Sequence, residues 1–209
     1  MDHLIVLIPS FNEINNLKKI INKEFKFLII DDCSTDGTEK LLKKNKIKYI
    51  RNEKKLGYEK SLTKGFKFII KNFKNIKTIC TIDGDNEHPQ KKIRKINRFL
   101  ISNDIDLIVC NRKKQNRLLE KIFSLFFYIK YGIKDPLTGM KFYKVNIIKK
   151  FIRSINHKYF LIDLLYLFLR NNYKVKNYKI TTRRNLKKSK IGFGLNIQLK
   201  ILKLFKFLF

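Results

Sequence analysis

The stretch IKTICTIDGDNEHP, residues 76–89, decides the fold of this chain. Its first half is rich in Ile and Thr, as is typical of a short buried strand. Asp83 and Asp85 follow this strand directly, with one residue between them. Two carboxylates at this spacing can hold a hard divalent cation. Because an Asp-x-Asp pattern is common by chance, its meaning depends on the sequence around it.

On both sides of this stretch, short apolar runs alternate with helical patterns. Strands are expected near residues 4–8, 26–31, 47–51, 77–82 and 105–110, and helices near 13–22, 37–45, 58–72 and 89–101. This alternation predicts an α/β fold with a mainly parallel sheet and helices on both of its faces. Ligands of such sheets bind at the carboxyl ends of the strands.

Polar clusters follow three of these strands, at residues 9–13, 31–37 and 83–85. Since the carboxyl ends of parallel strands lie at one edge of a sheet, we expect the three loops to converge on one crevice. Asp36 and Thr38 are also residue types that cap helices, and we expect one of them to cap the helix that follows.

From about residue 115 the pattern changes. A long apolar-rich helix is expected over 118–131, then a strand near 141–144, a helix near 158–171, a strand near 173–181 and a basic loop over 183–190. We expect one domain over residues 1–193, with its halves at 1–110 and 111–193. The tail, 194–209, carries three lysines at helical spacing and predicts a basic amphipathic helix that lies in a membrane interface or packs on the domain.

The composition limits the partners of the chain. Its 209 residues contain 48 Lys and Arg against 17 Asp and Glu, a formal net charge of +31. Such a charge attracts polyanions, namely nucleic acid, anionic lipid headgroups or phosphorylated substrates. The codon bias of an AT-rich genome is an alternative source of the many lysines. Three widely spaced cysteines and a first strand without a basic leader favour a cytoplasmic location.

Four segments in order resemble family 2 glycosyltransferases of the dolichyl-phosphate mannosyltransferase type. They are VLIPSFNE at 6–13, IIDDCSTDGT at 29–38, GYEKSLTKG at 57–65 and DGDNEHP at 83–89. The resemblance implies a GT-A fold, which is a Rossmann-like nucleotide-binding fold. It also implies a nucleotide-sugar donor, linked to GDP or UDP, that is bound by the 1–110 half.

The same resemblance implies roles for individual residues of the donor site. A divalent cation, Mg²⁺ or Mn²⁺, is expected on Asp83 and Asp85 with Glu87 as a third ligand, whereas His88 is expected to be structural. The expected donor-binding residues are Pro9, Asn12, Glu13, Asp31, Asp32, Ser34, Asp36, Gly57, Asp83, Gly84, Arg184, Ser189 and Lys190. The last three match a loop that closes over the diphosphate.

The segments CNR at 110–112 and DPLTGMK at 135–141 resemble polyprenyl-phosphate glycosyltransferases. Arg112 and Arg117 are therefore expected to hold the phosphate of a lipid acceptor, since arginine suits phosphate. A phosphate monoester is largely ionised at neutral pH and needs no strong base. Asp163 is expected to orient an arginine or, if the acceptor is a hydroxyl, to act as the base.

The sequence thus predicts an inverting, metal-dependent transfer of a sugar to a polyprenyl phosphate. The enzyme would be peripheral on the inner face of the cytoplasmic membrane, held by its basic surface and tail. The alternatives are transfer to a sugar hydroxyl of a surface polysaccharide or glycolipid, and a degenerate basic protein that only binds membranes or nucleic acid. Nucleic acid is not expected, because acidic loops lie where a phosphate-binding groove needs cations.

Overall fold

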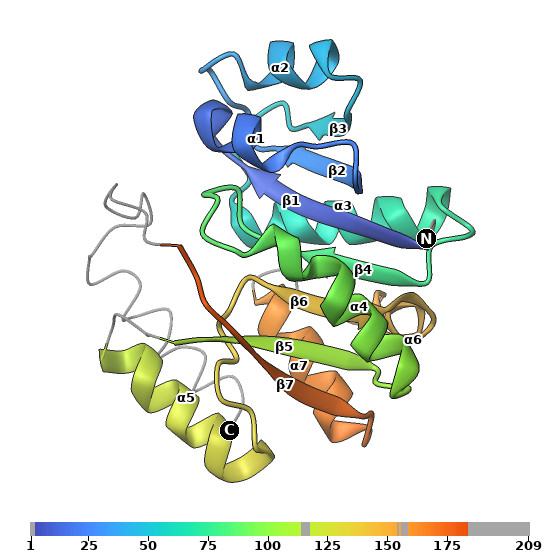
Figure 1. Ribbon diagram of the computed structural model, residues 1–209, viewed down its shortest axis with the longest axis vertical. Helices are drawn as coiled ribbons and strands as arrows, with labels where there is room; N and C mark the ends of the chain where they lie inside the picture. The colour runs from blue at the N-terminus through green and yellow to red at the C-terminus, as the bar shows by residue number, and fades with distance from the viewer. Residues whose placement is uncertain (1–2, 114–117, 154, 156–158, 184–209) are drawn as a thin grey trace.

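A computed structural model describes residues 3–113, 118–153, 155 and 159–183 of the chain. One seven-stranded sheet forms its centre, with the strand order β3-β2-β1-β4-β6-β5-β7. Helices cover both faces of the sheet, as Figure 1 shows. Within the described residues, no helix is both long and apolar enough to cross a membrane.

The strands are β1 (Leu4–Ser10), β2 (Lys26–Asp31), β3 (Lys48–Arg51), β4 (Thr78–Thr81), β5 (Leu107–Arg112), β6 (Lys141–Lys144) and β7 (Val175–Ile180). The helices are α1 (Ile14–Ile20), α2 (Thr38–Lys44), α3 (Tyr58–Asn72), α4 (Ile93–Ser102), α5 (Leu118–Tyr131), α6 (Val145–Phe151) and α7 (Phe160–Arg170). A short 3₁₀ turn, Gln90–Lys92, precedes α4.

Two hydrophobic clusters separate the helices by the face they cover. Residues of α3, α5, α6 and α7 share one cluster with the strands, whereas residues of α1, α2 and α4 belong to the other. Strands β1, β2 and β5 are almost entirely buried, as expected for strands that are covered on both faces. The predicted α/β class and its mainly parallel sheet are confirmed.

Strand β6 is the exception to the parallel arrangement, since it runs antiparallel to both β4 and β5. Its first residue, Lys141, pairs with Thr81 near the end of β4 and with Val109 of β5. The chain therefore enters β6 at the carboxyl edge of the sheet, beside the loop that follows β4. This topology brings residues 135–140 next to the predicted metal-binding motif.

The sequence located most elements but not every boundary. The helix expected at 89–101 begins at Ile93, because residues after Pro89 form the 3₁₀ turn first. Helix α6 was not predicted, because it follows β6 directly at Val145 with no Gly or Pro between the two elements to mark a boundary. The tail, 194–209, lies outside the described residues.

Helix α3 lies unusually close to the sheet at Gly65. A Cβ atom at this position would lie 2.4 Å from Cδ1 of Leu7 and 3.1 Å from Cγ1 of Ile30. Leu7 and Ile30 are fully buried in β1 and β2, so the surrounding core has little room to move. Glycine at this position lets α3 pack directly on the strands that lead into the site.

We expect Gly65→Val to destabilise the fold by about 1–3 kcal/mol, because the added carbons overpack the contact between α3 and β1. Thermal or urea unfolding followed by circular dichroism measures this loss. Lys67→Ala, at an exposed position of the same helix, serves as the control and should change stability by less than about 0.5 kcal/mol. An unchanged midpoint for Gly65→Val would contradict the close contact.

Candidate active site

The loops that follow β1, β2 and β4 meet at the carboxyl edge of the sheet, as predicted. Asn12 has a positive φ of 54°, and its backbone N–H donates to the hydroxyl of Ser34 at 2.8 Å. Its side-chain oxygen accepts a bond from the backbone N–H of Thr35, also at 2.8 Å. Gly84 packs against the first loop, since a Cβ there would lie 3.3 Å from the carbonyl oxygen of Pro9 and 3.7 Å from Glu13.

The carboxylate of Asp83 is held from three sides. The hydroxyl of Tyr58 donates to one oxygen at 2.6 Å, and Nε2 of His88 lies 3.0 Å from the other. Gly139 forms the third side, because a Cβ on it would lie 2.3 Å from both carboxylate oxygens. His88 is buried, and its role in holding Asp83 agrees with the structural role that the sequence predicted.

Asp83 and Asp85 differ in their electrostatic surroundings. Burial acts to raise the pKa of Asp83, but the hydrogen bonds from His88 and Tyr58 outweigh it and leave the pKa below its ordinary value. Burial, followed by the negative charge of Asp83, raises the pKa of Asp85. A divalent cation placed between the two would relieve this repulsion, so the local charge favours cation binding.

The donor atoms at this position also suit a hard cation. Both side chains offer carboxylate oxygens, and one oxygen of Asp85 accepts the backbone N–H of Glu87 at 3.0 Å, which orients it. Among the residues that the structure describes, no three His, Cys, Asp or Glu side chains gather as a metal site. Mg²⁺ in particular is commonly held by one or two carboxylates together with phosphate oxygens of a substrate. The pair fits that arrangement, and Glu87 as a third ligand stays a prediction.

Asp31 at the end of β2 is fully buried and has partners within the protein. Its carboxylate forms an ion pair with Arg51 at 2.7 Å and accepts the backbone N–H of Ser34 at 3.1 Å. These contacts shape the loop that follows β2. A contact between Asp31 and a nucleotide stays a prediction.

Asp32 joins the β2 loop to the start of α3. Its carboxylate accepts the backbone N–H groups of Leu56 and Gly57, at 2.7 and 2.8 Å, and the side-chain amide of Asn52 at 2.9 Å. Gly57 has a φ of 90°, a conformation that glycine adopts easily. By fixing this turn, Asp32 positions the next residue, Tyr58, to reach Asp83.

Asp36 accepts hydrogen bonds from the first turns of two helices. One oxygen bonds to the backbone N–H of Ile14 in α1, and the other to the N–H and hydroxyl of Thr38 in α2. Asp36 thus accepts the first N–H of each helix, although the N-cap residue of α2 is Gly37, which forms no side-chain cap. The Asp36 carboxylate orders the loops, whereas a direct contact with the donor stays a prediction.

Arg112 is the last residue of β5 and binds Asp135 through both its backbone and its guanidinium group. Its Nε and Nη2 donate to the Asp135 carboxylate at 2.8 and 3.0 Å, and its backbone N–H donates to the same group at 3.1 Å. Glu120 lies 3.7 Å from Nη2. Asp135 is buried, so this pair anchors the 135–139 segment that carries Gly139. The Arg112 side chain thus has a structural task besides any contact with an acceptor, and Arg117 lies outside the described residues.

Lys141 is a buried cation of the site whose role the sequence did not reveal. Its side chain is fully buried, and its Nζ donates to the carbonyl oxygen of Thr138. Burial lowers the pKa of Lys141 to about 8, although the carboxylates of Asp135, Glu59 and Asp83 act to raise it. In a chain with 48 Lys and Arg, one lysine among many carries no sequence signal. The contact of Lys141 with Thr138 and its nearness to the carboxylates become visible only when β6 is placed between β4 and β5.

Asp163 lies in the first turn of α7 and is buried. This end of α7 adjoins the start of α3, because the backbone N–H of Leu161 donates to Glu59 at 3.2 Å. Glu59 follows Tyr58, which contacts Asp83. Asp163 therefore lies on the side of the fold that carries the site, while its function stays a prediction.

The predicted closing loop begins beside the metal-binding motif. The backbone N–H of Arg183 donates to the carbonyl oxygen of Glu87 at 2.9 Å, and its guanidinium donates to Asn86 at 3.3 Å. The chain therefore reaches the motif at the residue where that loop starts. The loop residues themselves, Arg184, Ser189 and Lys190, lie outside the described residues.

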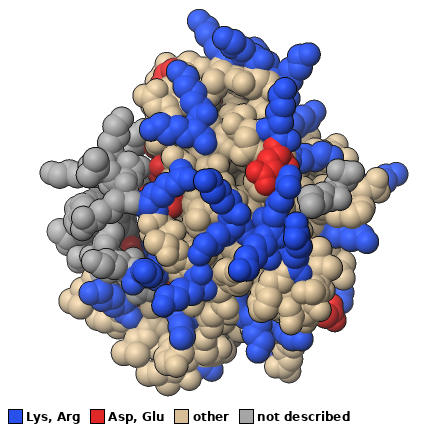
Figure 2. Space-filling view, viewed as in Figure 1, with Lys and Arg blue, Asp and Glu red and all other residues tan. Residues whose placement is uncertain are grey.

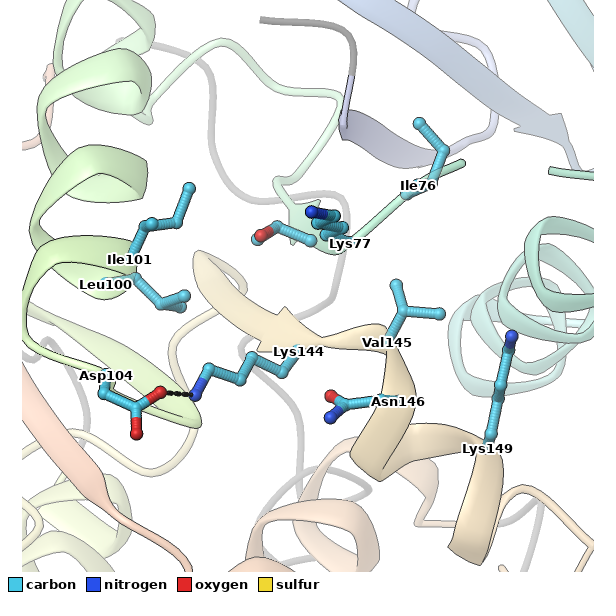
Figure 3. Close-up of a pocket in the computed structure, with 10 residues that line it drawn as sticks. Ile76, Lys77, Leu100, Ile101, Asp104, Lys144, Val145, Asn146 and Lys149 are labelled. Carbon is cyan, nitrogen blue, oxygen red and sulfur yellow. Dashed lines mark hydrogen bonds and ion pairs between the residues drawn. The ribbon is translucent and has the colours of Figure 1, made fainter. Parts of the chain in front are cut away.

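A cavity of 420 Å³ lies away from this site, at the opposite edge of the sheet (Figure 3). Its wall includes Lys77 before β4 and Lys144 at the end of β6. Lys144 is already paired with Asp104 and Asp106, at 2.5 and 3.0 Å. We assign no chemistry to this cavity, because none of the residues that hold Asp83 line it.

These features define a class of protein. A mainly parallel sheet with one antiparallel strand beside an Asp-x-Asp loop is the GT-A arrangement of glycosyltransferases. Crystal structures of glucosyl-3-phosphoglycerate synthase from Mycobacterium tuberculosis share the fold. The complex with phosphoglyceric acid has a TM-score of 0.69 at 13% identity, over 97% of this chain and 76% of that one. The complex with Mn²⁺ and UDP-glucose has a TM-score of 0.69 at 16% identity, with the same coverage.

The family follows from sequence comparison. The model of glycosyl transferase family 2 matches residues 5–160, and the chain belongs to this family. It is therefore a glycosyltransferase. An uncharacterized protein of Methanocaldococcus jannaschii is 32% identical over 169 residues, which cover 70% of this chain and 73% of the relative. A second uncharacterized protein of that organism is 24% identical over 94% of this chain and 87% of its own length.

Gly139→Ala should reduce sugar transfer by about 100-fold, because the new methyl group displaces the Asp83 carboxylate. The rate of transfer, measured beside the thermal midpoint, separates this loss from unfolding. Lys67→Ala, at an exposed position of α3, is the control and should keep both the transfer rate and the thermal midpoint of the wild type. Full activity of Gly139→Ala would mean that the contact with Asp83 is not needed.

The buried Lys141 should make stability depend on pH. Its pKa is about 8 in the fold against 10.5 for an ordinary lysine, so the unfolded chain binds more protons between these values. The free energy of unfolding contributed by Lys141 therefore rises across this window, by up to about 3 kcal/mol. Urea unfolding from pH 7 to 10 should show this rise in wild type relative to Lys141→Met. Lys71→Met, at an exposed position, should follow wild type, and parallel profiles for all three would refute the prediction.

Proposed function

We propose that this enzyme transfers a sugar, with inversion, from a UDP-linked donor to a polyprenyl phosphate at the inner face of the cytoplasmic membrane. The observation that carries the proposal is the Asp83 carboxylate, held ionised beside Asp85 at the carboxyl edge of the sheet. The M. tuberculosis structures hold UDP-glucose with Mn²⁺, which supports a UDP-sugar and a divalent cation here.

Different residues have different roles in the proposed donor site. Asp83 and Asp85 would hold a divalent cation, which stabilises the negative charge of the departing diphosphate. Tyr58, His88 and Gly139 keep the Asp83 carboxylate in one orientation, so little reorganisation is needed when the donor binds. The loops of Asn12 and Ser34, tied to each other, form the neighbouring wall of the donor site.

A phosphate acceptor is supported by the charge and the chemistry of the site. Arg112 lies close enough to Asp83 for its positive charge to lower the pKa of that carboxyl, which places a cation beside the metal motif. A phosphate monoester attacks as an anion, so the site needs no strong base. The M. tuberculosis enzyme binds phosphoglyceric acid in one structure and glycerol 3-phosphate in another, which are also phosphate esters. The resemblance of residues 110–112 and 135–141 to polyprenyl-phosphate glycosyltransferases favours a lipid.

The second candidate is transfer to a hydroxyl of a glycan, with Asp163 as the base. It is favoured by the burial of Asp163 at the end of α7 that adjoins α3. A buried carboxylate has the environment in which a base is tuned. The two candidates differ in what they require of this single side chain.

The test is transfer of radiolabelled sugar from UDP-sugars and GDP-sugars to short polyprenyl phosphates, phosphoglyceric acid and glycan acceptors, with Mg²⁺ or Mn²⁺. We expect label in the lipid phase from a UDP-sugar, lost on chelation, and lost by about 100-fold or more in Asp85→Asn. Asp163→Asn should retain transfer to a phosphate but lose transfer to a hydroxyl. Absence of lipid label with every donor would refute the polyprenyl phosphate, and label in the glycan alone would favour the second candidate.

A further inference from the structure

Helix α5 exposes an apolar stripe to the surroundings. Leu118, Ile122, Leu125 and Ile129 recur at intervals of four, three and four residues, which places them on one face of the helix. Leu118 is 73% exposed and Ile129 is 77% exposed. Among the described residues, the large exposed apolar side chains outside α5 are Phe99 and Ile101. Such a concentration on one helix marks an interaction surface.

The opposite face of α5 fixes how the stripe is presented. Phe123 and Phe127 are fully buried, and their ring centroids are 4.9 Å apart. Phe127 also packs on Tyr131, with a centroid distance of 5.5 Å. Helix α5 lies at the outer edge of the molecule, at the lower left of Figure 1. The helix is thus anchored by one face and leaves the apolar stripe pointing outward.

Among the described residues of α5 and the turn that follows it, every exposed charged side chain is positive. Lys121 and Lys130 are exposed on α5, and Lys134 is exposed just after it. The one acidic residue of α5, Glu120, is buried and lies toward Arg112. Figure 2 shows Lys and Arg spread widely over this view of the molecule, with few acidic side chains between them. A surface of this kind combines apolar contact with attraction to anions.

We propose that α5 is a membrane-binding helix, whose stripe inserts into the interface of an anionic lipid bilayer. Two other occupants of the stripe are conceivable, a second copy of the chain and the chain's own tail, and charge disfavours both. A second copy of the chain carries the same net charge of +31, and the tail over 194–209 has three lysines and no acidic residue. Either would bring lysines against lysines, whereas anionic headgroups neutralise them.

The position of α5 along the chain, between Arg112 and Asp135, indicates what a membrane contact would do for the site. Arg112 ends the strand before α5, and Asp135, its ion-pair partner, lies in the segment just after α5. A bilayer on the stripe would hold this acceptor side of the site close to lipid headgroups. That use rests on the proposed function, whereas the binding of α5 to lipid does not.

The first test uses the lack of tryptophan in the chain. Ile129→Trp gives a single reporter on the stripe, and Ile101→Trp gives its matched control on α4. With phosphatidylcholine vesicles that contain phosphatidylglycerol, emission from Ile129→Trp should shift to the blue and be quenched by brominated lipid. Ile101→Trp should show neither change. A reporter at 129 that is blue-shifted before lipid is added would show that the tail or a second copy covers the stripe, and would overturn the proposal.

The second test measures the strength of binding by sedimentation with the same vesicles. Ile129→Gln should weaken binding by about tenfold, because one buried aliphatic side chain is lost from the lipid contact. Ile101→Gln should bind like the wild type, and vesicles of phosphatidylcholine alone should bind both variants weakly. Equal binding of the two variants to anionic vesicles would overturn the proposal.

These vesicles contain no polyprenyl phosphate, so the outcome is independent of the acceptor. If the polyprenyl hypothesis fails, lipid binding through α5 remains. If instead Ile129→Gln binds vesicles normally while label still enters polyprenyl phosphate, the docking proposal fails and the proposed function stands.

Discussion

The contact between the Asp83 carboxylate and the backbone at Gly139 is the constraint on which the site depends. It joins the end of β4 to the segment that leads into β6, two parts of the chain more than fifty residues apart in sequence. Any side chain at 139 would occupy the space of the carboxylate. Because β6 runs antiparallel to its neighbours, this segment enters the sheet beside the motif. The local fold of the acidic loop therefore depends on a long-range strand pairing.

Charge balance accounts for the residues that surround this contact. Burying a carboxylate is costly unless it is paired and hydrogen-bonded. Asp135 is paired with Arg112, and the ammonium group of Lys141 lies near enough to Asp135 and Asp83 for their charges to affect its pKa. Asp83 has hydrogen-bond partners on both oxygens, while Asp85 keeps a raised pKa beside it. The negative charge that remains without a full counter-charge lies on Asp83 and Asp85, the two residues that are proposed to hold the cation.

Much of this was visible in the sequence, because the signal was local. The period of the apolar residues located the strands and helices, and the position of Asp83 after an apolar run indicated the metal motif. The tasks of Asp31, Asp32 and Asp36 were less visible, since their partners are backbone N–H groups and side chains of other segments. The insertion of β6 and the burial of Lys141 depend on pairing across the sheet. A pattern within one segment does not reveal such contacts.

Helix α5 shows how the two faces of one element serve different purposes. Its buried face packs Phe123 and Phe127 into the core and turns Glu120 toward Arg112, so it supports the ion pair that anchors Gly139. Its outer face carries apolar side chains that are exposed and do not belong to the core. Stability of the fold explains the first face but not the second, since exposed Leu and Ile contribute little to folding and favour aggregation. An apolar stripe in so basic a protein is best explained by a surface that is both apolar and anionic, as a lipid bilayer is.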